Sequence, residues 1–308
     1  TLRHTLFPYT TLFRSPAFNH KIDLVLNMQK DETPGIAFMS RLFPNSRGEY
    51  GVFDTDASLE QGRNLGTGKD LFNAMLTWQF YKSENTSWTT VSSFRKTGSF
   101  ARWDGDGTAA PAIFMTEDAG SEQLYQEVRY NFSRNSRLNG SGGVSYWREK
   151  ARQTYGFSPN EQNMFHLFFD PAGLVMPNGQ PVAVPALPDI PQLGPLGGMP
   201  LPENHEEENR SHATNQAAEA FVDGTWQLTR RIFLNGGLRA VYDRFNLSSE
   251  AEFTGGDPSV LGNLTGNAPN LFFRPSETQS IQKSALSFTW RGGFQFRFSG
   301  KANFFANY

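Results

Sequence analysis

The chain has 308 residues, a formal net charge of −2 and no cysteine, which excludes disulfides, thiol catalysis and thiolate metal sites. A mean hydropathy of −0.50 excludes a helical membrane protein, and no apolar run reaches the length of about eighteen residues that a spanning helix needs. A membrane-spanning β-barrel is not excluded, because half of each barrel strand faces a polar lumen. Without a basic stripe, a nucleic-acid partner is not expected. The aromatic content of 14 %, with 28 Phe, suits the aromatic girdles of such a barrel.

The first residues stand apart from the rest. Residues 5–15 read TLFPYTTLFRS, which looks like a translated sequencing adapter, so we predict that residues 1–15 are an artefact. No secretory signal is visible, and the pattern stops in the middle of a strand at Tyr308. We therefore expect residues 16–308 to be a fragment of a larger chain.

The remaining chain alternates between apolar and polar residues in segments with the period of two that defines a strand. The clearest pair covers residues 216–246, where Ala220 and Val222 share an apolar face opposite Glu219 and Asp223. In chain order, the predicted strands are residues 20–30, 70–81, 87–99, 122–132, 137–149, 216–228, 232–246, 284–298 and 302–308. Strands of this length, with one apolar and one polar face, favour a membrane barrel over a soluble sandwich.

The predicted connections alternate strictly between long and short. The long ones are residues 31–69, 100–121, 150–215 and 247–283. The third contains a segment, Pro171–Pro202, whose proline content predicts neither a regular strand nor a regular helix. Outer-membrane barrels have short periplasmic turns and long extracellular loops, whereas a soluble sandwich has no reason to separate loop lengths by end. The sequence therefore predicts an all-β, antiparallel up-and-down transmembrane β-barrel of about nine strands.

Charged residues on the polar faces are expected to line the lumen, where they pair with one another or contact a plug; these are Glu127, Arg129, Arg239, Asp243, Arg291 and Arg297. Aromatic residues on the apolar faces are expected to contact lipid or form the girdle, although a platform for a sugar is an alternative; these are Trp226, Tyr242, Trp290, Phe294 and Phe298.

Two clusters could hold a cation. Weak candidates for a divalent metal or a ferric complex are His205, Glu206, Glu207 and His212, for which an acidic, solvated loop surface is the alternative. Asp104 and Asp106 could bind calcium, but without an EF-hand pattern a solvated turn is favoured. His166 is expected to be a packed loop histidine. Because the sequence lacks a Ser–His–Asp grouping, a phosphate-binding loop and an HExxH motif, neither an enzyme nor a cofactor is expected.

Three segments resemble the barrel of TonB-dependent outer-membrane receptors. QLYQEVRYNFSRNSRLNGSGGVSYWREK is similar to a strand with a Glu–Val–Arg element that turns into a glycine-containing strand. AEAFVDGTWQLTRRIFLNGGLRAVYDRFNL is similar to a hairpin of that family that ends in Gly237, Leu238 and Arg239 with Asp243 following. SALSFTWRGGFQFRFSGKANFFANY is similar to a later hairpin, without the Ser/Arg-Gly element that normally follows it.

This resemblance implies a barrel in the bacterial outer membrane with about 22 strands and a plugged lumen. It implies uptake of a ferric siderophore or a similar scarce nutrient, which binds at the long extracellular loops. Energy would come from the TonB-ExbB-ExbD complex, acting through a plug domain, and residues 16–308 would be a partial receptor barrel from which that domain is missing. Alternatives are a passive outer-membrane porin and a secreted soluble all-β binding protein.

Overall fold

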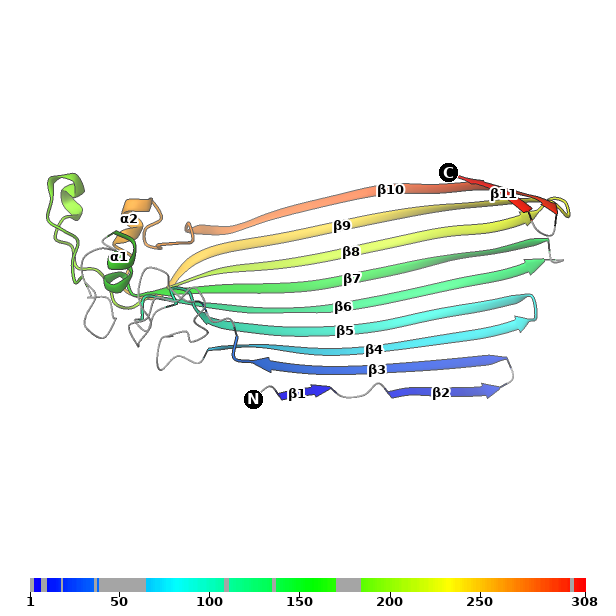
Figure 1. The fold of residues 1–308 in the computed structure, drawn as a ribbon, viewed down its shortest axis with the longest axis horizontal. Helices are drawn as coiled ribbons and strands as arrows, with labels where there is room; N and C mark the ends of the chain where they lie inside the picture. Colours follow the sequence, from blue (N-terminus) through cyan, green and yellow to red (C-terminus); the bar gives the residue numbers. More distant parts are fainter. Residues whose placement is uncertain are drawn as a thin grey trace.

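The computed structural model describes residues 3–6, 10–17, 19–35, 38, 65–107, 111–134, 137–169, 184–299 and 302–308. Nearly all of them lie in one antiparallel sheet (Figure 1). Its strands are β1 (Arg3–Leu6), β2 (Thr10–Ala17), β3 (His20–Thr33), β4 (Gly66–Ser83), β5 (Thr86–Asp104), β6 (Ile113–Arg134), β7 (Leu138–Pro159), β8 (His205–Gln227), β9 (Ile232–Gly256), β10 (Ser276–Ser299) and β11 (Ala302–Asn307).

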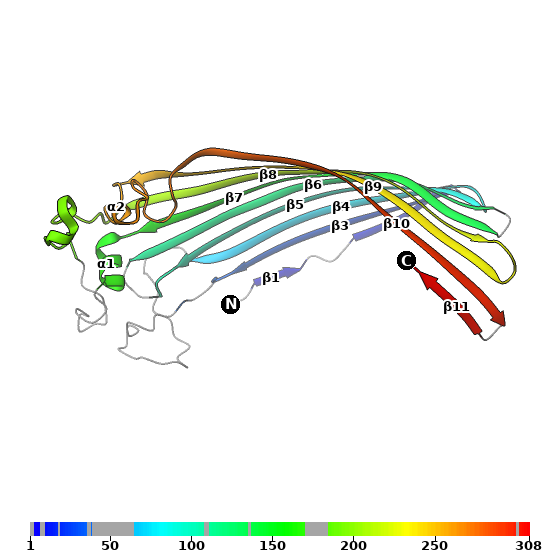
Figure 2. The same ribbon diagram turned by 90° about the horizontal axis from the view of Figure 1, so that it is seen from above.

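Each strand from β3 to β11 pairs with its neighbours in sequence, which is the up-and-down order expected from the connection lengths. The nine predicted strands are confirmed as β3 to β11. β1 and β2 both pair with β3, so they lie along one edge of the sheet. They fall almost entirely within residues 1–15, whose interpretation as an artefact stays a prediction. Figure 2 shows the whole sheet bent into an arch.

The two ends of the sheet differ, in agreement with the alternating connection lengths. The strand ends that short turns join lie at one end of the sheet, and the strand ends that long connections join lie at the other (Figure 1). The predicted bounds of the long connections are wrong, however, because the strands continue well into each of them. The connections of the structure span residues 34–65, 105–112, 160–204 and 257–275. Backbone pairing continues beyond the point where the apolar alternation stops. The alternation stops there because polar residues occupy much of both faces.

The faces of neighbouring strands are matched by the register. Leu76 on β4 and Val222 on β8 have even numbers, as do the other apolar residues of their faces, and both are exposed. Pairing keeps even-numbered residues opposite even-numbered ones, for example Val222 opposite Leu238, so one apolar face runs across the sheet. We call the even-numbered face the apolar face and the odd-numbered face the polar face.

Apolar residues cover only a band of the apolar face. On β8 it runs from Ala218 to Trp226, and farther from the short turns it is replaced by Thr214 and His212. This band of about ten residues matches the span of a tilted membrane strand. In the part of the chain with assigned structure, no helix is long and apolar enough to cross a membrane.

The described parts of the β7–β8 and β9–β10 connections form a small cap beside the strand ends. It contains α1 (Glu161–Phe169), a 3₁₀ helix, η1 (Pro191–Leu196), and α2 (Leu261–Thr265). The described part of Pro171–Pro202 contains no regular helix, as predicted, because η1 is a 3₁₀ segment interrupted at Gly194, whose φ of 53° and ψ of −126° are not helical. The core of the cap consists of Phe157, Leu187, Leu201, Val260, Leu261 and Leu271.

Candidate functional site

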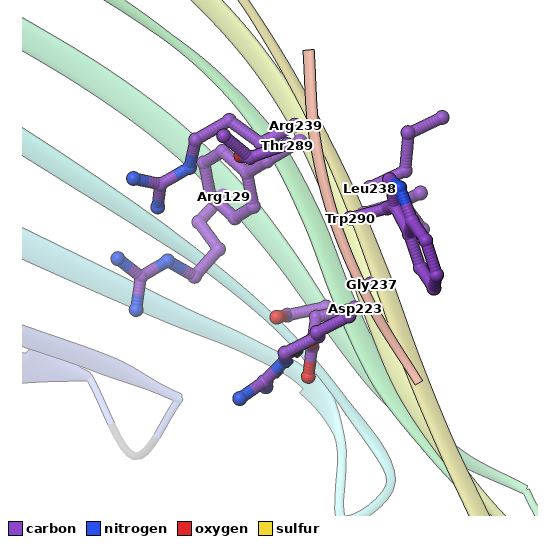
Figure 3. A pocket seen from close by; sticks show the side chains of 11 residues that line it. Arg129, Asp223, Gly237, Leu238, Arg239, Thr289 and Trp290 are labelled. Atoms are coloured by element: carbon purple, nitrogen blue, oxygen red, sulfur yellow. Dashed lines mark hydrogen bonds and ion pairs between the residues drawn. The ribbon is translucent and has the colours of Figure 1, made fainter. Parts of the chain in front are cut away.

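The most developed group of charged side chains lies on the polar face of β6 to β10. A hollow of about 520 Å³ is lined there by Arg129, Phe221, Asp223, Arg239 and Arg291, among others. Figure 3 shows the labelled polar side chains on one side of the sheet and Leu238 and Trp290 on the other. We call Arg129, Phe221, Asp223, Arg239 and Arg291 together the arginine wall.

Two rows of the sheet build the arginine wall. In the first row, Arg129 pairs with Gly143, Gly143 with Phe221, and Phe221 with Arg239. A Cβ added at Gly143 would lie 2.6 Å from the Val128 carbonyl oxygen and 2.9 Å from the Phe221 ring. Glycine at this position therefore leaves room for the ring of Phe221.

The second row holds an ion pair over another glycine. Asp223 pairs with Gly237, and Gly237 pairs with Arg291. With no side chain between them, the Asp223 carboxylate accepts hydrogen bonds from Arg291 Nε (2.7 Å) and Nη2 (2.6 Å). A Cβ at Gly237 would collide with this carboxylate.

Each arginine of the wall has its own acidic partner. Arg129 Nη2 lies 2.5 Å from Glu127, and Arg239 Nε lies 3.1 Å from Glu219. The Phe221 ring lies between these two arginines, with their guanidinium carbons 5.7 Å and 5.9 Å from its centroid. The guanidinium groups thus have fixed positions and their formal charges are balanced.

The arginines stay accessible despite these contacts. Side-chain exposure is 65 % for Arg291, 56 % for Arg239 and 42 % for Arg129. A guanidinium has five donors, so donors remain for an anionic or planar polar ligand or for another protein segment. The wall holds no group arranged for proton transfer to a substrate; its chemistry is recognition.

Four of the six predicted lumen residues belong to the arginine wall or its ion pairs: Glu127, Arg129, Arg239 and Arg291. Arg297 lies elsewhere on the polar face, 4.2 Å over the ring of Phe233, and Asp243 pairs with Ala217 and Ala285 in the backbone register. Glu219 and Asp223 were expected on the polar face, but their ion pairs with Arg239 and Arg291 were not predicted, and neither was the contact of Phe221 with the arginines. Their odd numbers and the pairing of β8 with β9 are the signals that place them.

The four weak metal candidates do not converge, and they lie on β8 and not in a loop. His205 and Glu207 are buried on one face, whereas Glu206 and His212 are exposed on the other. Among the described residues, no three His, Asp or Glu side chains form a group suited to a metal ion. A metal role for these residues therefore rests on the sequence alone.

Glu207 has a structural role in the cap. Its buried carboxylate accepts hydrogen bonds from three successive backbone N–H groups, those of Leu271 (3.0 Å), Phe272 (2.7 Å) and Phe273 (3.4 Å). It therefore ties the connection between β9 and β10 to the start of β8.

His205 lies against the same connection. Its Nδ1–H donates to the Asp257 carbonyl (2.9 Å), and its Nε2 lies 3.8 Å from Glu207. Burial acts to lower the pKa of His205, but the Glu207 carboxylate, the Asp257 carbonyl and the charge of Glu161 outweigh it and raise the pKa above its usual value.

Glu161 at the start of α1 is the second buried carboxylate of the cap. It accepts hydrogen bonds from the Ser259 hydroxyl and from the backbone N–H groups of Val260 (3.1 Å) and Leu261 (3.0 Å). Burial raises the pKa of Glu161, and these hydrogen bonds oppose the shift. The carboxylate joins α1 to α2 across two connections that are far apart in sequence.

The candidate calcium carboxylates hold a turn. Asp104 is buried, and its Oδ1 accepts from the backbone N–H groups of Asp106 (3.0 Å) and Gly107 (2.9 Å). Asp106 accepts from the Ile113 N–H (2.8 Å). The preferred expectation of a turn is met, but the turn is not a fully solvated one.

Much of the expected substrate-binding surface is not described. Residues 36–37, 39–64, 108–110 and 170–183 of the predicted loops lie outside the described residues. His166 falls in α1, and its side chain also lies outside them.

Comparison with known proteins agrees with this geometry. Residues 22–308 match the family model described as TonB dependent receptor-like, beta-barrel. Among solved structures, the ferric yersiniabactin uptake receptor FyuA from Yersinia pestis is similar, with a TM-score of 0.56, 10 % identity and coverage of 94 % of this chain and 34 % of that one.

Two further structures are less similar. The siderophore receptor PiuA from Acinetobacter baumannii has a TM-score of 0.49 and 11 % identity, with 94 % of this chain and 39 % of that chain covered. The ferric-catecholate import receptor Fiu from E. coli K12 has 0.46 and 15 %, with 94 % and 44 % covered. The chain thus spans about a third to less than half of the length of these receptors.

No curated protein sequence matches the chain. The family match covers nearly all of the sheet, and the family consists of transport receptors of the bacterial outer membrane, not of enzymes. The chain belongs to the TonB-dependent receptor β-barrel family.

Proposed function

We propose that the chain forms part of the barrel wall of an outer-membrane receptor that imports a ferric siderophore or a similarly scarce nutrient. Uptake is driven by the TonB-ExbB-ExbD complex acting through a plug domain. The cap end faces the cell exterior, and the short turns face the periplasm. The substrate class follows that of FyuA, a ferric yersiniabactin uptake receptor to which the sheet is similar in fold.

The observation that carries this proposal is the arginine wall. In a simple lipid-facing sheet these positions would carry apolar side chains, since a charge in the bilayer interior is expensive. Here three arginines, each held by a carboxylate or an aromatic ring, lie on the face opposite the apolar band, and Figure 3 labels two of them, Arg129 and Arg239. Partly exposed guanidinium groups suit the carboxylate and catecholate oxygens of an anionic iron chelate, as well as the surface of a plug.

The direct test is uptake by the source bacterium after disruption of the gene that encodes this chain. Cells grown under iron limitation are given a panel of radiolabelled ferric siderophores, with and without a protonophore. We expect the disrupted strain to lose the energy-dependent part of the uptake of one siderophore class. Restoring the gene should recover it.

A second strain separates transport from barrel assembly. Restoration with Arg239→Gln and Arg291→Gln together should leave the amount of receptor in the outer membrane unchanged and weaken uptake, because the donors are lost from the lumen. Uptake that continues in the disrupted strain for every compound tested contradicts the proposal. Uptake that depends on the gene but ignores the protonophore indicates a passive pore instead.

A further inference from the structure

The outward face carries a second group of basic residues, separate from the arginine wall. It begins where the apolar band ends, on the side of the long connections. A hollow of about 310 Å³ lies there on β5 to β8 and is lined by Lys96, Lys150, Arg152 and His212, with Glu122 between them. All five have even numbers and therefore share the apolar face of the sheet.

The register brings these side chains together in two adjacent rows. Lys96 pairs with Glu122 and Glu122 with Lys150 in the first row. Arg152 pairs with His212 in the second row. Neighbouring strands are about 4.8 Å apart, so Lys96 and Lys150 stand about 10 Å apart with one strand between them.

Two glycines leave part of the second row without side chains, and one of them, Gly120, lines the hollow. Gly98 pairs with Gly120, and Gly120 pairs with Arg152. A Cβ added at Gly98 would meet nothing within 4 Å, so the space above it is open. A Cβ at Gly120 would lie 3.6 Å from Arg152 Nε, which places the guanidinium directly beside this glycine.

The charges of the hollow are not balanced. Glu122 forms an ion pair with Lys96 at 2.8 Å. Within the described part of the chain, Lys150 and Arg152 have no carboxylate in ion-pair range. Two exposed cations therefore remain above a band that is apolar on the same face of the same strands. This arrangement, with an anion-binding hollow directly above a lipid-facing surface, matches a lipid whose headgroup carries phosphate and whose chains lie along the band.

We propose that this hollow binds the phosphorylated headgroup of a lipid of the outer leaflet, with Lys150 and Arg152 as the main phosphate contacts. The inference rests on the membrane placement given under the proposed function. It does not depend on which nutrient is transported, because the hollow lies on the opposite face from the arginine wall.

The test uses the protein embedded in phosphatidylcholine nanodiscs that contain a small fraction of lipid A, with its two phosphates, or of a dephosphorylated lipid A. Native mass spectrometry counts the lipids retained, and a titration gives the apparent affinity. We expect selective retention of the phosphorylated lipid. Each basic residue near a membrane surface contributes about 1 kcal/mol, so Lys150→Gln with Arg152→Gln should weaken binding about 30-fold.

Two further variants separate a built site from general charge attraction. Arg230→Gln with Arg231→Gln removes the same charge at the short-turn end and should leave binding unchanged. Gly98→Phe places a ring in the open space beside Gly120 at the edge of the hollow, without changing the charge, and should weaken binding several-fold. Equal loss with the short-turn variant, or no loss with the Lys150 and Arg152 variant, overturns the proposal.

Free phosphate provides the last arm of the test. Inorganic phosphate alone should not displace the lipid, because it gains nothing from the apolar band. Displacement would identify a site for free anions and overturn the lipid assignment. Failure of the protein to enter the bilayer contradicts the membrane placement itself, whereas normal embedding with unselective lipid binding contradicts only this inference.

Discussion

The half of the sheet near the short turns and the half near the long connections obey different physical rules. In the first, each strand has one apolar and one polar face, and large apolar side chains such as Leu238 (52 %) and Leu286 (61 %) are exposed. In the second, the regular alternation is lost, and apolar residues of the connections pack with Phe157 of β7 to form the core of the cap. The same strands run through both halves. The environment that each face contacts, and not the backbone structure, therefore determines where apolar and polar residues alternate.

The difference shows where each half gets its stability. The band relies on a lipid environment for its exposed apolar face. The cap relies on buried polar contacts, in which Glu161 and Glu207 satisfy backbone N–H groups of the connection between β9 and β10. We therefore expect the band to be destabilised when a charge is introduced, and the cap to be destabilised when a buried charge is removed.

The largest effect is expected for a charge placed in the apolar band. Val222→Arg should destabilise the protein in a bilayer by about 2–4 kcal/mol, the cost of arginine near the midplane of a membrane strand. The measurement is the free energy of folding into lipid vesicles from a urea titration. Thr214→Arg, on the same strand and face but beyond the band, is the control and should cost little. Equal costs at both positions would remove the distinction between the two halves.

The next effect concerns the cap. Glu207→Gln keeps the shape of the side chain but removes a charge that holds three backbone N–H groups. We expect a local loss of about 2–3 kcal/mol, since hydrogen bonds to charged groups contribute about 1.5–3 kcal/mol each and the amide oxygen keeps part of them. Hydrogen exchange at Leu271 and Phe272 should speed up about 30-fold or more, while amides of the band stay protected.

Glu206→Gln is the matched control for that change, because Glu206 is the exposed neighbour on the other face. It should leave the exchange of Leu271 unchanged. Similar acceleration by both variants would mean that net charge, and not the buried carboxylate, holds the connection.

A smaller effect should appear with pH. The folded-state pKa of His205 is raised, so its stabilising contribution is complete below about pH 6.5 and is lost as the pH rises through the raised pKa. The stabilising contribution of Glu161 also decreases as the pH rises, because its pKa is raised too, and the decrease begins at a lower pH than that of His205. We expect the free energy of cap opening, from hydrogen exchange corrected for intrinsic rates, to fall as the pH rises above 6.5.

His205→Gln should remove the part of this pH dependence that lies above pH 6.5. The effect should be smaller than that of Glu207→Gln, because the three backbone hydrogen bonds of Glu207 remain. A cap that becomes more stable with rising pH would contradict the direction expected from the two raised pKa values.

The smallest effect is expected in the arginine wall. Phe221→Leu removes a ring that lies against Arg129 and Arg239, and each contact contributes about 0.5–1 kcal/mol at an exposed site. A double-mutant cycle with Arg239→Gln should give a coupling energy in that range. The cycle of Phe221 with Arg297, which lies over Phe233 instead, should give no coupling.

The band was well predicted from the sequence because its signal is local. Alternation at Ala220, Val222 and Trp226 is visible without knowledge of any partner strand. The order of the nine strands followed from connection lengths, and the polar-face charges followed from their period. Beyond the band the alternation disappears, so the predicted strands ended too early; His205 and Glu207 were placed in a loop although backbone pairing extends over them.

The cap was not predictable from local patterns. Its buried carboxylates act over large separations: Glu161 binds the backbone of Leu261, and Glu207 that of Leu271. No spacing rule in one sequence links such positions. The partners of the arginine wall were missed for a related reason, because the role of Phe221 depends on the glycine beside it in the next strand.

The matched register of the two faces also has a consequence for assembly. A slip of β8 by one residue against its neighbours would turn Glu219 and Asp223 toward lipid, so odd shifts are strongly penalised. A slip of β8 by two residues keeps the faces but moves Glu219 away from Arg239 and Asp223 away from Arg291. Two different penalties therefore fix the register of the strands. Shifts by an odd number of residues expose charged side chains to lipid, and shifts by an even number break ion pairs and the close packing around the glycines.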